Sequence, residues 1–229
     1  MPYAEIDTAL KTWSPFLLGG FGMNILVSVV AMAIGTAIGW ALALLRVSHN
    51  ASGVRFGLWT TEFSRSVPTI VFQFYLAAIL PNEIVIPSIA VVLDFPAWLK
   101  ASLALAVAVV GFTSDNITIA MEEWKRGHRA AAFLFIPSWT SYALIIVMAS
   151  STASIIGVDE LLSRCNTVIS ATDNTKLLLP IYLYACLFFF GFCFPLTLVM
   201  KRVSQLLVSK LAPNPVANSG EQREAAKAA

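Results

Sequence analysis

Residues 115–137 read D-N-I-T-I-A-M-E-E-W-K-R-G-H-R-A-A-A-F-L-F-I-P and form a polar break between two long apolar blocks. The centre of this stretch, 122–129, holds five charged residues and a histidine among eight residues, in a chain that is only 12% charged. Because charge is so scarce elsewhere, we expect this stretch to lie in water at the surface of a membrane.

The composition supports a membrane protein. The chain has 229 residues, of which 58% are hydrophobic, and its mean hydropathy is +0.76. Soluble proteins are roughly 45–50% apolar and about 25% charged, so membrane lipid must be part of the solvent of this chain. The net charge of +2 and the scatter of basic residues over loops argue against nucleic acid as a partner.

Three uncharged segments are long enough to cross a bilayer, which takes about 20 apolar residues in a helix. They are Phe16–Leu45, Ala130–Val158 and Leu177–Met200, with 30, 29 and 24 residues. The first contains Gly35-x-x-x-Gly39, a spacing of small residues that lets two helices approach closely. Two interpretations of this spacing are open, packing within one bundle and a seam between two subunits.

Two further segments complete a prediction of five spans. Ala101–Met121 has 21 residues and is interrupted only by Asp115, and Ser66–Asn82 has 17 and becomes a full span if its helix begins near Leu58. Ile84–Leu93, with 10 residues, is too short to cross, so we expect an interfacial or re-entrant piece. The predicted fold class is therefore all-α, a polytopic membrane helical bundle.

The distribution of Lys and Arg predicts the orientation. With five spans, eleven of these residues fall on one side of the membrane and four on the other: Arg46, Arg55, Arg65, Lys125, Arg126, Arg129, Lys201, Arg202, Lys210, Arg223 and Lys227 against Lys11, Lys100, Arg164 and Lys176. The N-terminus is then external and the C-terminus cytoplasmic. We expect residues 1–15 to be an external segment without a cleaved signal peptide, 16–210 a transmembrane domain, and 211–229 a disordered cytoplasmic tail.

No catalytic chemistry is visible in the sequence. His49 and His128 lie in different loops, and no hydrolase, metalloprotease or P-loop motif occurs. Glu122 and Glu123 are adjacent, so on a helix they point about 100° apart and do not form a facing pair. The cysteines have no pairing or metal-ligand spacing. We expect neither an enzyme nor a site for a metal or another cofactor.

One ion pair is predicted at membrane depth. Asp115 lies inside an apolar run, where a carboxylate is costly and usually faces a partner or a cavity. Arg65 begins the second predicted span at a comparable depth, and we expect the two side chains to pair between helices. The alternative is that each reaches the lipid headgroups independently.

Three stretches together carry a resemblance to a known family. The first runs from Leu17-Leu-Gly-Gly20 to Asn24-Ile-Leu-Val-Ser28 and continues to Arg46; the second is Glu62–Tyr75, with Arg65-Ser-Val-Pro68 and Gln73; the third is Ser151–Leu161, with Ile-Ile-Gly-Val and Glu160-Leu161. In this order they resemble the permease subunits of bacterial ABC importers for polar amino acids, the histidine/glutamine permease family. The likeness spans roughly 16–205.

The resemblance implies partners and a location. Two such subunits, identical or homologous, would form a path through the bacterial inner membrane, two cytoplasmic ATPase subunits would drive transport, and an external solute-binding protein would deliver an amino acid or a similar solute. Polar residues on inward helix faces would line the path, with Asn24, Ser28, Gln73, Thr113, Ser114 and Asn116 as candidates. The alternative for each candidate is a hydrogen bond between helices.

The same resemblance makes the polar break the loop that couples the permease to its ATPase. In the family this loop carries E-A-A-x-x-x-G, whereas here Gly127-His128-Arg129 is followed by Ala130-Ala131-Ala132, and the segment up to Thr152 is shorter. Three readings stay open: a working but divergent permease, a decayed paralogue that pairs in the membrane without ATPase coupling, and an unrelated small secondary carrier or channel.

Overall fold

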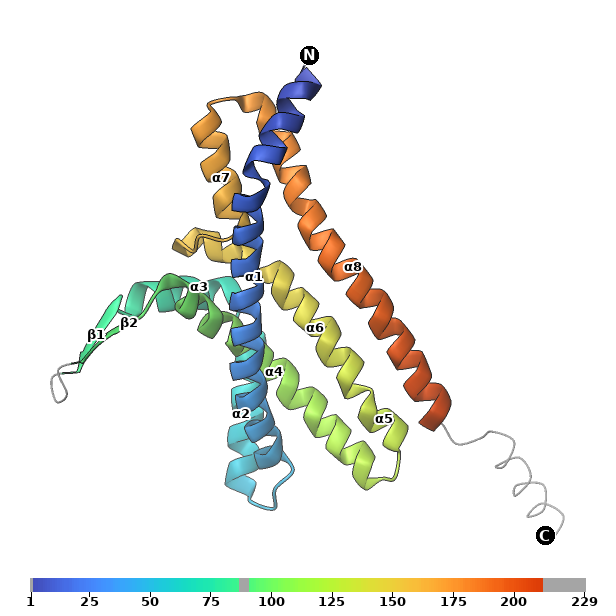
Figure 1. The fold of residues 1–229 in the computed structure, drawn as a ribbon. Helices are drawn as coiled ribbons and strands as arrows, with labels where there is room; N and C mark the ends of the chain where they lie inside the picture. The colour runs from blue at the N-terminus through green and yellow to red at the C-terminus, as the bar shows by residue number, and fades with distance from the viewer. Residues whose placement is uncertain (1, 87–90, 212–229) are drawn as a thin grey trace, which may run out of the picture.

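A computed structural model describes residues 2–86 and 91–211, and Figure 1 shows their arrangement. The described elements are, in order, α1 (Pro2–Arg46), α2 (Ala51–Ser66), α3 (Thr69–Ile79), β1 (Glu83–Ile86), β2 (Val91–Asp94), α4 (Ala97–Lys125), α5 (Arg129–Phe133), α6 (Phe135–Ala149), the 3₁₀ helix η1 (Ser150–Ile156), α7 (Leu161–Thr172), η2 (Thr175–Leu177) and α8 (Leu178–Leu211). The predicted helical class is confirmed.

Four helical stretches in the described part of the chain are long and apolar enough to cross a membrane: Ile6–Arg46, Ala97–Lys125, Ala131–Ile156 and Leu178–Leu207. The N-terminal end of α1 and the C-terminal end of α8 lie at opposite ends of the molecule (Figure 1). Because α1 begins at Pro2, residues 2–15 continue the first span as one helix. The predicted tail lies outside the described residues, apart from Leu211 at the end of α8.

The predicted span at 66–82 is wrong as a single helix, because the chain breaks between α2 and α3. Val67 is extended, with φ −99° and ψ 126°, since the ring of Pro68 disfavours helical backbone in the preceding residue. α3 has 11 residues and is about 16 Å long, which is too short to cross a bilayer of about 30 Å. In Figure 1, α3 turns sideways from the end of α2.

Of the short apolar piece predicted at 84–93, residues 84–86 and 91–93 lie in the two strands of a β-hairpin, the exception to the predicted all-α class, and residues 87–90 lie outside the described part of the chain. β1 pairs antiparallel with β2, from Glu83 opposite Asp94 to Ile86 opposite Val91. Most residues of β1 and β2 are Val or Ile, and β-branched residues favour strands. Lys100 ties the start of α4 to this region, because its Nζ donates to Leu80 O at 2.7 Å and to Asn82 Oδ1 at 3.0 Å.

The core forms where α1 packs against α4. A Cβ added at Gly35 would meet Ala106 O at 2.7 Å, and one at Gly39 would meet Val110 O at 2.8 Å. Small residues therefore let the two backbones approach closely. Of the two interpretations of this spacing, packing within one bundle is confirmed. The buried residues around this contact include Val27, Ala31, Leu105 and Val109.

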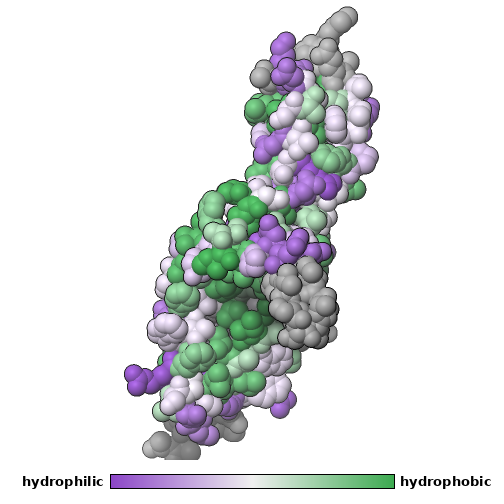
Figure 2. Space-filling view, turned by 90° about the vertical axis from the view of Figure 1, so that its left-hand side faces the viewer, coloured by the Kyte–Doolittle hydropathy of each residue, from purple (hydrophilic) through white to green (hydrophobic). Residues whose placement is uncertain are grey.

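Much of the remaining apolar surface is uncovered in the single chain. Figure 2 shows a broad hydrophobic patch over the lower part of the molecule, with hydrophilic residues above and below it. α8 diverges from the bundle in Figure 1 and exposes many large side chains, among them Leu183, Leu187 and Phe190. Such a surface needs lipid or another apolar partner to cover it.

The α1–α4 contact yields a stability prediction. Gly35→Ala should lower the free energy of unfolding by about 1–3 kcal/mol relative to Gly22→Ala, because its methyl group overpacks the interface. Gly22 is the matched control, since a Cβ there meets nothing within 4 Å. Denaturant unfolding of the purified protein in detergent measures both; equal stability of the two variants would contradict the packing argument.

Candidate functional site

Asp115 lies between two arginines from different helices. Its Oδ1 accepts a hydrogen bond from Arg46 Nη1 at 2.6 Å, and its Oδ2 accepts one from Arg65 Nη1. The structure thus brings Arg65 and Asp115 together and adds Arg46 from the end of α1. Arg46 also donates to Ser114 Oγ at 3.0 Å, and the Ser114 and Thr61 hydroxyls are 2.8 Å apart.

Two glycines give the arginine side chains room to reach Asp115. A Cβ at Gly57 would lie 2.7 Å from Arg46 Cγ, and a Cβ at Gly111 would lie 2.8 Å from Arg65 Cγ. Each stem therefore crosses a neighbouring helix where that helix has no side chain. The two arginines differ in exposure, since the side chain of Arg46 is 13% exposed and that of Arg65 is 60% exposed.

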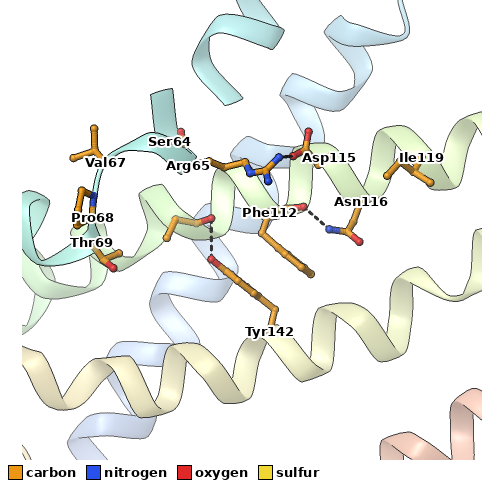
Figure 3. A pocket seen from close by; sticks show the side chains of 11 residues that line it. Ser64, Arg65, Val67, Pro68, Thr69, Phe112, Asp115, Asn116, Ile119 and Tyr142 are labelled. Carbon is orange, nitrogen blue, oxygen red and sulfur yellow. Dashed lines mark hydrogen bonds and ion pairs between the residues drawn. The ribbon is translucent and has the colours of Figure 1, made fainter. Parts of the chain in front are cut away.

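The exposed arginine lines a pocket of about 600 Å³ (Figure 3). The pocket lies between the end of α2, the break at Val67-Pro68, α4 and α6. Phe112 and Tyr142 form a stacked pair with ring centroids 3.9 Å apart, and Tyr142 Oη donates to Ala108 O at 3.2 Å. Asn116 Nδ2 donates to Phe112 O at 2.9 Å.

The cluster of Arg46, Arg65 and Asp115 has an excess of positive charge, and of these three residues Arg65 and Asp115 line the pocket. Two guanidinium groups share one carboxylate, so the three side chains carry a net charge of +1. Arg46 is mostly buried and does not line the pocket, and its Nε has no partner among the described residues, so the guanidinium donors that face the pocket are those of Arg65. A small anionic group is the ligand that this arrangement can bind, because a planar guanidinium matches a carboxylate.

A second polar network joins α1 to the start of α7. Glu160 is the N-cap of α7: its Oε1 accepts from Ser163 N at 2.9 Å, and its Oε2 accepts from Leu162 N and from Asn24 Nδ2, both at 3.0 Å. Asn24 also donates to Ser150 Oγ and accepts from Leu161 N. Burial raises the pKa of Glu160, while the hydrogen bonds that it accepts act in the opposite direction.

The six candidates for the path lie in different surroundings. Asn24, Ser28 and Ser114 are buried, and their polar atoms form hydrogen bonds with other helices or with the backbone of their own helix. Gln73 accepts from Thr152 Oγ1 at 2.9 Å, but its Nε2 is buried without a partner among the described residues, as is Thr113 Oγ1. Asn116 is the one candidate of the six that lines the pocket of Figure 3.

The predicted coupling loop forms a tight corner. Gly127, with φ +86°, ends α4, and His128 precedes α5, which contains Arg129 to Ala132. Glu123 braces the corner, because its carboxylate contacts Arg126 Nη1 and His128 Nδ1, each at 2.8 Å. The connection between the two spans is therefore short and held by side chains.

Sequence reasoning missed three residues of these sites: Arg46, Glu160 and Tyr142. Arg46 ends an apolar run, where a basic residue by itself indicates the side of the membrane and not a partner. Glu160 carries no local signal of its role, because Ser, Thr, Asp and Asn are the preferred N-caps and Glu is not among them. The position of Tyr142 opposite Phe112 depends on helix packing, which no local pattern reveals.

Comparisons with known proteins bear on this architecture. No family model matches the chain. It is 21% identical over 210 residues to the "Probable glutamine ABC transporter permease protein GlnM" of Bacillus subtilis (strain 168), which covers 83% of this chain and 92% of that protein. A solved structure described as "Crystal structure of an amino acid ABC transporter with histidines" matches with a TM-score of 0.65 at 17% identity, over 89% of this chain and 98% of that chain.

This chain has an ABC transporter permease fold. The predicted resemblance is thereby confirmed, as is the prediction of a multi-pass protein of the bacterial inner membrane. The matches extend over 83% and 89% of this chain and over more than nine tenths of each similar protein.

Glu160 provides a prediction that links pH to stability. Glu160→Gln should lower the free energy of unfolding at neutral pH by about 1–3 kcal/mol, because one buried donor loses its accepting oxygen. The raised pKa means that the folded wild type takes up a proton more readily than the unfolded chain. Its stability should therefore increase as pH falls from above the raised pKa towards the ordinary value, and the variant should lack this increase.

Unfolding at neutral and mildly acidic pH tests this, with Glu62→Gln as the control because Glu62 is exposed. An identical pH dependence of wild type and Glu160→Gln would overturn it.

Proposed function

We propose that this chain is the membrane-spanning subunit of an ABC importer for amino acids or similar small polar solutes, and that it is a transport component rather than an enzyme. The observation that carries the proposal is the near full-length likeness in fold and sequence to amino acid ABC transporter permeases. The pocket at Arg65 supports it independently, because its spare charge suits a substrate carboxylate.

The pocket of Figure 3 is a candidate subsite for the substrate. Arg65 would bind the α-carboxylate of an amino acid, since Asp115 remains neutralised by Arg46 when Arg65 turns to a ligand. The stacked rings of Phe112 and Tyr142 would form an apolar wall. Asn116 Oδ1 accepts no hydrogen bond within the described part of the chain and would accept one from the ammonium group.

The proposal includes partners. A second permease subunit, identical or homologous, would complete the path and cover part of the exposed apolar surface. Two ATPase subunits would bind on the cytoplasmic side, at the corner that Glu123 braces through Arg126 and His128, and an external solute-binding protein would deliver substrate.

Co-expression with an ABC ATPase, a second permease and a solute-binding protein from the same organism tests the function. We expect the ATPase to co-purify through this chain and ATP to drive uptake of a labelled amino acid into proteoliposomes. A permease pair that retains no ATPase would indicate the decayed paralogue. Uptake that needs an ion gradient and no ATP would indicate a secondary carrier.

The subsite predicts a specific kinetic change. Arg65→Gln should raise the KM for amino acid uptake by roughly tenfold or more, because a charge-assisted hydrogen bond contributes about 1.5–3 kcal/mol. Arg55→Gln is the control, since Arg55 is exposed on the same helix and lines no pocket described above. An unchanged KM in Arg65→Gln would remove Arg65 from the substrate site and leave the importer assignment intact.

A further inference from the structure

A second cavity, of about 650 Å³, lies between α1, α4, α5 and α6, apart from the pocket at Arg65. Its lining is almost entirely apolar and includes Trp40, Leu44, Met121, Phe133 and Ile136. Several of these side chains are open to the outside, since Leu44 is 55% exposed and Ile136 is 46% exposed. The cavity is therefore a groove on the outer surface of the bundle, and its size is within the range of about 300–1,000 Å³ of small-molecule sites.

The groove lies where three spans end on the same side of the membrane. The first span ends at Arg46, the second ends at Lys125 and the third begins at Ala131. Two half-exposed tryptophans, Trp40 and Trp124, line the groove at this level. Tryptophan is enriched at the boundary between hydrocarbon and headgroups, so the groove opens into one leaflet of the bilayer at headgroup depth.

Two basic side chains at its mouth have no acidic partner in the described part of the chain. Lys125 lines the groove, and the guanidinium of Arg129 lies 5.5 Å from the centre of the Trp124 ring. Both are exposed, and neither forms an ion pair among the described residues. The nearby Glu122 and Glu123 are engaged by Arg126 and His128.

We propose that this groove binds an anionic phospholipid, with one acyl chain along the apolar lining and the phosphate between Lys125 and Arg129. The complementarity is twofold, because the apolar groove suits a chain that lies in the bilayer and its mouth holds uncompensated positive charge. Basic pockets between membrane helices bind anionic headgroups through this combination. The inference requires only that the chain spans a membrane, so it goes beyond the proposed transport function.

Occupancy of such a site would depend on the lipid composition of one leaflet, and the bound lipid would lie against the corner between α4 and α6. Lys125 ends α4, and Phe133 ends α5, so a lipid in the groove would contact both sides of the corner that Glu123 braces.

Native mass spectrometry of the full-length protein, with phosphatidylglycerol or phosphatidylcholine of the same acyl chains added, tests the proposal. We expect wild type to retain phosphatidylglycerol in preference to phosphatidylcholine. Lys125→Gln with Arg129→Gln should weaken this retention roughly twenty- to thirtyfold, since each basic group near an anionic surface contributes about fivefold in affinity. Arg55→Gln with Arg202→Gln is the matched control, because both arginines are exposed and neither lines the groove.

A second variant separates a groove from a merely basic surface. Ala120→Phe fills part of the lining without changing charge and should also weaken retention of phosphatidylglycerol. The proposal is overturned if the two lipids are retained equally, if the control pair loses as much as the groove pair, or if Ala120→Phe has no effect. A second protein chain found in the groove in place of lipid would overturn it too.

Discussion

One carboxylate, Asp115, constrains the arrangement of three helices. An ionised carboxylate at membrane depth is costly, and removal of two charges from water costs several kcal/mol per ion unless the geometry of the pair is excellent. Arg46 from α1 and Arg65 from α2 meet this requirement, each at a different oxygen of the carboxylate. The aliphatic parts of the two arginine side chains pass over Gly57 and Gly111, where a Cβ would collide with them. The ion pairs with Asp115 therefore depend on the close packing of the helices at these glycines.

The polar groups of the interior divide into two kinds. The network of Asn24, Ser150 and Glu160 is fully engaged, and it fixes α7 to α1. The cluster at Asp115 is different, because two guanidinium groups share one carboxylate and Arg65 retains unused donors at a pocket. A ligand can be bound where such donors are accessible, which is why the proposed substrate subsite is placed at Arg65 and not at the more deeply buried residues.

Much of this architecture could be predicted from the sequence because it follows local rules. Charge-free length predicted the long helices, and an isolated Asp115 at comparable depth to Arg65 was sufficient to suggest their contact. The apolar composition of residues 66–82 predicts one helix, but the extended backbone at Val67, before Pro68, divides this segment into the end of α2 and α3. Arg46 was missed because its role depends on how far its stem extends across α2, and the β-hairpin depends on pairing between residues that are separated in sequence.

The central claim is that Arg46 neutralises Asp115 in the interior while Arg65 stays available. Two double-mutant cycles on the free energy of unfolding test it most directly, one with Arg46→Gln and Asp115→Asn, the other with Arg65→Gln and Asp115→Asn. We expect a coupling energy of about 2–3 kcal/mol in the first cycle and less than about 1 kcal/mol in the second, because the Arg46 pair is mostly buried and Arg65 is mostly exposed. Additive effects in the Arg46 cycle, or a stronger coupling in the Arg65 cycle, would contradict the account.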